Sequence, residues 1–139
     1  MKTTLTAGIA AKRRFGIDRE RTIDFMGEAA RVYATPMLVR DIEVTCREFL
    51  LAHLDAGEDS VGTRVEIDHL AATLLGMVVE IGVSVAEVKG RAVTFAVEAH
   101  DGIDTVCRGR HVRFVVEVSQ TEVRLAAKAQ QAAALAKGA

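Results

Sequence analysis

Two side chains able to carry protons stand where apolar neighbours surround them, and the first is Glu43. On a helical wheel Glu43 falls at the edge of the apolar stripe formed by Val39, Cys46 and Leu50. It is therefore either an edge residue paired with Arg47 four positions later, or a carboxylate aimed into a site. Taken alone, this stretch favours the edge residue, because most such charges are solvated.

The second such side chain is His69, which lies in a segment of alternating polarity. His69 takes the same face as Val65 and Ile67, whereas the charged residues of the segment take the other face. An inward histidine is either a core residue satisfied by a backbone carbonyl, which parity alone favours, or a general acid or base. In the second case burial and a neighbouring carboxylate would set its pKa.

The helix that carries Glu43 is predicted to begin at Thr35. Threonine is a good N-cap, and Pro36 suits the first helical position because the first N–H groups of a helix lack partners. Taken singly, Thr35 is expected only to cap this helix. The helix should end near residues 54–60, where Gly57 and a cluster of polar residues supply stop signals. Apolar residues on both of its sides predict that it is largely enclosed.

Strand-like segments surround this helix in the sequence. One or two short strands are expected in residues 8–25, followed by a helical turn in residues 26–33. Val- and Ile-rich strands joined by tight turns are predicted after the helix, at residues 63–73, 77–88, 91–100 and 104–118. This order predicts an α+β domain over residues 1–139, in which a curved antiparallel sheet of about five strands wraps a long central helix. Residues 121–139 should form a loosely attached C-terminal helix or tail.

Composition narrows the class of protein. A net charge of −1 and the absence of Trp make nucleic acid an unexpected partner. Cys46 and Cys107 have no metal-site spacing, so free buried thiols and no metal are expected. No stretch reaches membrane-spanning length, and the N-terminus does not read as a signal peptide, so we expect a cytoplasmic protein without membrane contact. The enclosed helix and apolar edge strands predict a homodimer.

Three segments resemble the hotdog-fold acyl-CoA thioesterases of the fluoroacetyl-CoA thioesterase type. They are YATPMLVRDIE, VGTRVEIDHLAATLLG and GRAVTFAVEAHDGIDTVCRGRHVRFVV, and the likeness runs from about Val32 to Val118. The resemblance implies a dimeric hotdog fold and hydrolysis of an acyl-CoA thioester at a site near the dimer interface. It implies no cofactor, since CoA is part of the substrate.

The resemblance also implies roles for particular residues. Thr35, Glu43 and His69 match the catalytic threonine, glutamate and histidine of the family. Gly62 matches the glycine whose backbone N–H meets the thioester carbonyl, and Arg113 matches an arginine of the last strand.

A lid segment before the threonine completes the resemblance, with Tyr33 as a further acyl-pocket residue. Met26 and Ala29 stand where the fluoroacetyl-specific enzyme has phenylalanines, so a different small acyl group is expected. For the phosphates of CoA the candidate cations are Arg113, Arg40 and Arg91.

Two other functions fit a hotdog fold, since a fold does not determine chemistry. One is a non-catalytic module that binds acyl-CoA or another small ligand, and the other is a hydratase or dehydratase. The presence of Thr35, Glu43 and His69 together favours the hydrolase.

Overall fold

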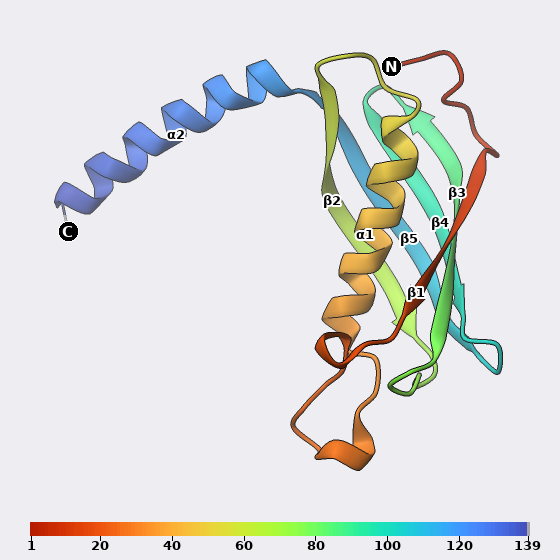
Figure 1. Cartoon of the computed structure of the whole chain (residues 1–139). Helices are drawn as coiled ribbons and strands as arrows, with labels where there is room; N and C mark the ends of the chain where they lie inside the picture. Colours follow the sequence, from red (N-terminus) through yellow and green to blue (C-terminus); the bar gives the residue numbers. More distant parts are fainter. Residues whose placement is uncertain (139) are drawn as a thin grey trace.

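Five antiparallel strands and one long helix make up the body of the molecule (Figure 1). The computed structural model describes residues 1–138, so Ala139, the last residue of the predicted tail, lies outside the described residues. The elements in chain order are β1 (Ala10–Gly16), η1 (Arg19–Arg21), η2 (Glu28–Ala30), α1 (Thr35–Leu51), β2 (Glu58–His69), β3 (Val78–Lys89), β4 (Ala92–His100), β5 (Thr105–Glu117) and α2 (Val118–Gly138). The strand order in the sheet is β1-β3-β4-β5-β2, so β1 and β2 are its two edges.

The helix α1 lies across one face of the curved sheet, as Figure 1 shows. Its side chains Leu38, Ile42, Cys46 and Leu50 are fully buried and form the centre of the core. The buried inward side chains of β3 and β4 alternate with half-buried or exposed ones, as expected for a sheet with one covered face. The predicted α+β arrangement, a hotdog fold with about five strands around a central helix, is thus confirmed.

The sequence pattern predicted the ends of β3, β4 and β5 to within two residues. The N-terminal third has fewer regular elements than the sequence allowed. Residues 8–25 contain one strand, β1, followed by a single 3-10 turn. The helical turn expected in residues 26–33 is a second 3-10 turn, Glu28–Ala30. Both cysteines are buried and free, as predicted.

A buried carboxylate fastens the segment between β1 and α1 to the body. Asp41, on α1, accepts hydrogen bonds from Arg21 Nε at 2.8 Å and Nη2 at 3.1 Å. It also accepts a hydrogen bond from the Tyr33 hydroxyl at 2.6 Å. Asp41 is 1% exposed, so its charge depends on these three donors. The segment is therefore held at both ends by one side chain of the central helix.

Replacing Asp41 with Asn should lower the free energy of unfolding by about 2 kcal/mol, because the charge-assisted bonds to Arg21 and Tyr33 are lost in a buried place. Urea unfolding of wild type and variant measures this. Glu28→Gln is the control, since Glu28 binds Arg19 and Arg31 from the exposed surface, where solvent screens such pairs and they contribute little to stability. Equal effects of the two substitutions would contradict the role given to Asp41.

The C-terminal helix α2 stands apart from this body. It begins directly after β5, has no buried residue, and extends away from the sheet on the side of β2 (Figure 1). The sequence predicted this helix from residue 121, and the structure begins it at Val118. Among residues 1–138, α2 included, there is no helix that combines the length and apolar character needed to cross a bilayer.

Candidate active site

Thr35 and His69 meet at one end of α1. Thr35 is the first residue of α1 and His69 is the last residue of β2. The Thr35 Oγ1 atom lies 2.8 Å from His69 Nδ1, within hydrogen-bond distance. The prediction that Thr35 only caps the helix is wrong: the N-cap is Ala34, and no side chain bonds the free N–H groups there. Because Thr35 lies inside the helix, its hydroxyl is free to contact the imidazole.

The other ring nitrogen of His69 has no partner. Nε2 is buried and makes no hydrogen bond within the described residues, which is uncommon for a buried polar atom. Burial lowers the pKa of His69, and the backbone at Ala71 offsets this in part. The Tyr33 ring stands edge-on to the imidazole, with 6.2 Å between ring centroids. A neutral imidazole with an unpaired Nε2 can accept a proton there.

An apolar cavity of about 350 Å³ lies beside this histidine. Its lining residues are Ile23, Phe25, Val32, Tyr33, Thr35, His69, Leu70, Ala71 and Ala72. Tyr33, predicted to be an acyl-pocket residue, lines this cavity, whereas Met26 and Ala29 lie on the exposed surface of the same segment and are not among the lining residues. Phe25 was missed, and only its place next to Met26 could have indicated it. The cavity suits an uncharged group.

Glu43, Gly62 and Arg113 form a second cluster. The Glu43 carboxylate is 42% exposed and lies 3.5 Å from Arg113 Nη1. The predicted pairing of Glu43 with Arg47 is wrong, because Arg47 binds Asp59 instead, at 3.0 and 2.7 Å. With Arg47 engaged elsewhere, the Glu43 carboxylate is free to face Gly62. A cavity of about 310 Å³ borders the cluster, lined by Pro36, Val39, Arg40, Glu43, Val44, Arg47 and Arg113.

Gly62 faces the Glu43 carboxylate at very close range. A Cβ atom added at Gly62 would lie 2.9 Å from Glu43 Oε2 and 3.1 Å from His111 Cε1. Real Cβ atoms do not approach neighbours this closely, so a side chain here would displace the carboxylate. Glycine is therefore the residue that lets the backbone approach Glu43.

Behind this cluster lies a buried network that sequence reasoning missed. Arg113, 4% exposed, donates from Nε to Ser60 Oγ at 2.7 Å and from Nη2 to the Ser60 carbonyl at 2.8 Å. Its Nη1 faces His111 Nε2 at 3.2 Å, and His111 Nδ1 lies 2.8 Å from the Arg64 carbonyl. The network holds the guanidinium toward Glu43. Only the i, i+2 spacing of His111 and Arg113 in β5 could have indicated it.

The three arginines proposed for CoA differ in their surroundings. Arg113 is buried in the network just described, and Arg91 donates to Glu58 and to the Val115 carbonyl. Arg40 is exposed and lines the cavity beside Glu43. Among these three, Arg40 is the one that is both exposed and at the rim of the cavity beside Glu43.

A β-bulge gives Gly62 and His69, the two candidate residues of β2, the same orientation. Gly62 pairs with Arg113 and His69 with Cys107, and both partners are buried on the face of the sheet that α1 covers. Seven positions separate Gly62 from His69, which would put them on opposite faces of a regular strand. The register shift between Gly62 and Arg64 absorbs one residue and corrects this.

The two clusters do not touch within one chain. Thr35 and Glu43 are eight residues apart on α1, which corresponds to about 12 Å along a helix. The cavities beside them share no lining residue. One chain therefore brings together Thr35 with His69, and Glu43 with Gly62 and Arg113, but not the two groups with each other.

Comparison with known proteins assigns the chain to a family. Residues 17–119 match the model of the fluoroacetyl-CoA-specific thioesterase family. The fluoroacetyl-CoA thioesterase of Streptantibioticus cattleyicolor is 33% identical over 101 residues, which are 73% of this chain and 73% of that protein. The chain belongs to the fluoroacetyl-CoA-specific thioesterase family. This confirms the resemblance drawn from the sequence and the expectation of a thioesterase-type enzyme.

Solved structures of two proteins described as thioesterases agree with the fold. A thioesterase superfamily member from Thermus thermophilus superposes with a TM-score of 0.86 at 27% identity, covering 94% of this chain and 97% of that one. A variant of the fluoroacetyl-CoA-specific thioesterase in complex with fluoroacetate and CoA superposes with a TM-score of 0.78 at 29% identity, covering 84% and 99%. The likeness extends over most of each chain.

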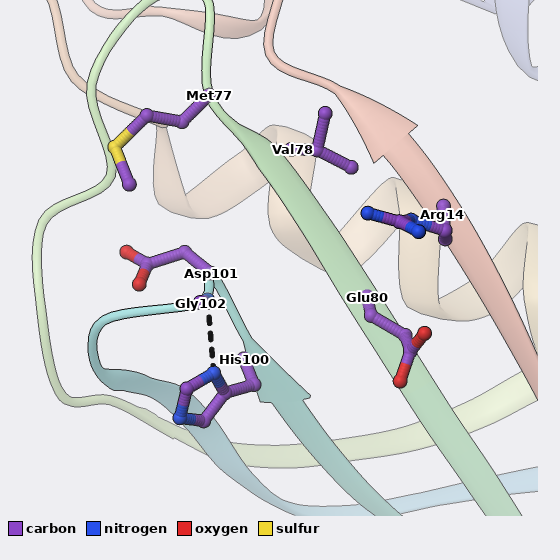
Figure 2. A pocket seen from close by; sticks show the side chains of 7 residues that line it. All are labelled: Arg14, Met77, Val78, Glu80, His100, Asp101 and Gly102. Carbon is purple, nitrogen blue, oxygen red and sulfur yellow. Dashed lines mark hydrogen bonds between the residues drawn. The ribbon is translucent and has the colours of Figure 1, made fainter.

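Another hollow, of about 420 Å³, lies on the face of the sheet away from α1 and holds none of the residues that this thioesterase family would use. Figure 2 shows Arg14, Glu80 and His100 around it, with Asp101 and Gly102 at the turn that follows β4. Asp101 is engaged within the turn and with Thr73, which it binds at 2.9 Å. The bond to Thr73 holds the segment after His69 in place.

Stability should fall in mild acid because His111 is buried as the neutral ring. Burial lowers the pKa of His111 below its usual value of about 6.5, so the unfolded chain binds the proton more tightly than the folded one. The free energy of unfolding should therefore decrease as pH falls below about 6.5. Urea unfolding between pH 7.5 and 5 measures this, and His111→Gln should reduce the slope. An unchanged slope in the variant would contradict the assignment.

Proposed function

We propose that the protein hydrolyses a small acyl-CoA thioester to the free acid and CoA, at a site that two copies of the chain build together. The observation that carries the proposal is the contact between Thr35 and His69, with His69 Nε2 left unpaired beside an apolar cavity. Family membership supports the reaction type.

The reaction needs few groups. Water adds to the thioester carbonyl, the C–S bond breaks, and the CoA thiolate leaves with a proton. His69 takes a proton from the water and returns it to the thiolate, while Thr35 orients the ring. In this route Glu43 orients the attacking water. In the alternative route the Glu43 carboxylate attacks the carbonyl and expels the CoA thiolate to form a mixed anhydride, which water deprotonated by His69 then hydrolyses, and that proton passes to the thiolate. In both routes the Gly62 N–H donates to the oxygen as negative charge builds there. No cofactor takes part in this scheme.

A second copy would complete the site through the free edge of β2. If a two-fold axis passes near Glu66, the β2 strands of two copies pair antiparallel, with Val65 opposite the inward Ile67 of the other copy. His69 of one copy then lies beside the bulge at Gly62 and Thr63 of the other. This places His69 and Thr35 from one copy near Glu43 from the other, and it covers the strand edge.

The acyl group would lie in the apolar cavity beside His69. The lining offers side chains of Ile23, Val32 and Tyr33, and the Tyr33 hydroxyl points away to Asp41. Met26 and Ala29, which stand where the fluoroacetyl-specific enzyme has phenylalanines, are exposed, and Phe25 is the residue of this segment that lines the cavity. A small apolar acyl group other than fluoroacetyl therefore fits the site best.

Release of free thiol from a panel of acyl-CoAs tests the proposal. The panel comprises acetyl, fluoroacetyl, propionyl, butyryl, hexanoyl and phenylacetyl-CoA, and His69→Ala is assayed beside wild type. We expect hydrolysis by wild type and a loss of about 10³-fold in kcat/KM in the variant. Ligand-induced thermal stabilisation without any thiol release would overturn the proposal and favour an acyl-CoA binding module. Water addition to crotonyl-CoA without release of CoA would indicate a hydratase.

A further inference from the structure

The helix α2 has no visible source of stability in one chain. None of its side chains is buried, although it runs for 21 residues and exposes Val123, Leu125 and Leu135. A helix of this length is marginal in water when no tertiary contact supports it. The exposed leucines and the missing packing both indicate that another surface covers part of α2.

One face of α2 is apolar and narrow. Val118, Leu125, Ala129, Ala132 and Ala136 follow one another at spacings of seven, four, three and four, so they lie along one side of the helix. The opposite side carries Gln120, Arg124 and Gln131, with Ala127 and Ala134 between them, Val123 lies at its edge, and Leu135 lies between the two sides. Small alanines on the first side let a second surface approach the helix backbone closely.

A second apolar surface is also uncovered. Phe25 and Met26 in the segment before α1, and Leu70, Leu74 and Leu75 after β2, are between 43% and 78% exposed. We call these five residues the lid patch. Phe25 and Leu70 also line the cavity beside His69, so whatever covers the lid patch closes that cavity.

The fold brings these two surfaces together only between two copies. The first residue of α2, Val118, donates its N–H to the Gly57 carbonyl at 2.9 Å, which places α2 at the start of β2. The lid patch lies at the other end of β2, where the strand finishes at His69. Antiparallel pairing of two β2 strands about Glu66 puts the start of β2 in one copy beside the end of β2, and the segment that follows it, in the other.

We infer that α2 of each copy lies across the lid patch of the other copy and closes the acyl cavity there. The direction of α2 in Figure 1, outward past the β2 edge, is the one this arrangement requires. The inference rests on the proposed shared site and adds to it that the C-terminal helix forms part of the wall for the acyl chain. Longer apolar acyl groups should gain most from this cover.

Cross-linking between two differently marked chains tests the contact. One chain carries Ala129→Cys, the other Leu74→Cys, and the mixed dimer is treated with a flexible bismaleimide. Cys46 and Cys107 can stay, because both are buried, which raises their pKa to about 12 and about 11, and thiols react as thiolates. We expect covalent dimers from the mixture and few from either chain alone. Equal yields with Ala127→Cys, or cross-linking of the Ala129→Cys chain to itself, would overturn the inference.

Matched charge variants test the effect on the reaction. Ala129→Glu with Ala136→Glu alters the apolar face, and Ala127→Glu with Ala134→Glu places the same charges at the same spacing on the opposite face. In the first variant we expect kcat/KM for hexanoyl-CoA to fall about tenfold relative to acetyl-CoA, and in the second no change. Identical behaviour of the two variants would overturn the role of α2 and leave the proposed hydrolysis intact. Absence of hydrolysis in wild type would refute the proposed function, and cross-linking would still report on the contact.

Discussion

Mixing inactive Glu43→Gln chains with inactive His69→Ala chains should restore about a quarter of wild-type thioesterase activity. In the proposed dimer each site takes His69 from one copy and Glu43 from the other. A mixed dimer therefore has one site with both defects and one with none. Random reassociation makes half of the dimers mixed, and each of these has one intact site of two. Each variant alone should lose about 10³-fold in kcat.

A second pair of variants serves as the control. Thr35 and His69 come from the same copy, in hydrogen-bond contact at 2.8 Å. In mixtures of Thr35→Ala and His69→Ala chains every site of a mixed dimer keeps one defect, so activity should not exceed the mean of the two variants. The measurement is thiol release after the chains are unfolded together and refolded. If the Glu43→Gln mixture stays inactive while refolding yields dimers, the site lies within one chain and the proposed sharing is wrong.

Gly109→Ala should destabilise the protein by about 3 kcal/mol, the upper range for a group forced into a packed interior. A Cβ atom at this position in β5 would lie 2.0 Å from the Glu66 carbonyl oxygen and 2.7 Å from Ile67 Cα. Both contacts are with backbone, which cannot rotate away as a side chain can. The strands β2 and β5 would have to separate locally, and β2 carries both Gly62 and His69.

Gly82→Ala is the matched control for this substitution. Gly82 lies in β3, and a Cβ atom there would meet the Glu98 carbonyl oxygen at an ordinary 3.6 Å. Because alanine is also less flexible than glycine in the unfolded chain, this variant should be neutral or slightly more stable. Thermal unfolding of both variants measures the difference. A Gly109→Ala protein as stable as Gly82→Ala would show that β2 and β5 are less tightly joined than their spacing indicates.

Much of the fold could be predicted because its signals are local. The alternation of apolar and polar residues placed β3, β4 and β5, and it correctly gave His69 the inward face. Proline at position 36 marked the start of α1 to within one residue, since proline fits only the first turn of a helix. These signals depend on neighbours in the chain, which a sequence displays directly.

The contacts of the candidate site could not be predicted in the same way, since distant residues decide them. Arg47 stands four positions after Glu43 on the helix, yet Arg47 binds Asp59 of β2. Glu43 lies beside Arg113 instead. The Thr35 hydroxyl bonds His69, 34 positions away, in place of the helix end. The partner that a side chain binds depends on which residues tertiary packing brings near it, and the spacing of residues along one element does not reveal this.

The bulge in β2 makes the length of this strand matter more than its composition. Between Gly62 and His69 many substitutions keep the pattern of faces, but removing one of residues 64–68 while the bulge stays would leave an odd number of ladder steps, so that only one of the two residues could face α1. A change of one residue in length is harmless in most surface loops. In β2 it would shift the register, and every side chain on one side of the deleted residue would move to the other face of the sheet. Relatives in which both Gly62 and His69 face α1 should therefore vary in the amino-acid types of this segment far more readily than in its length.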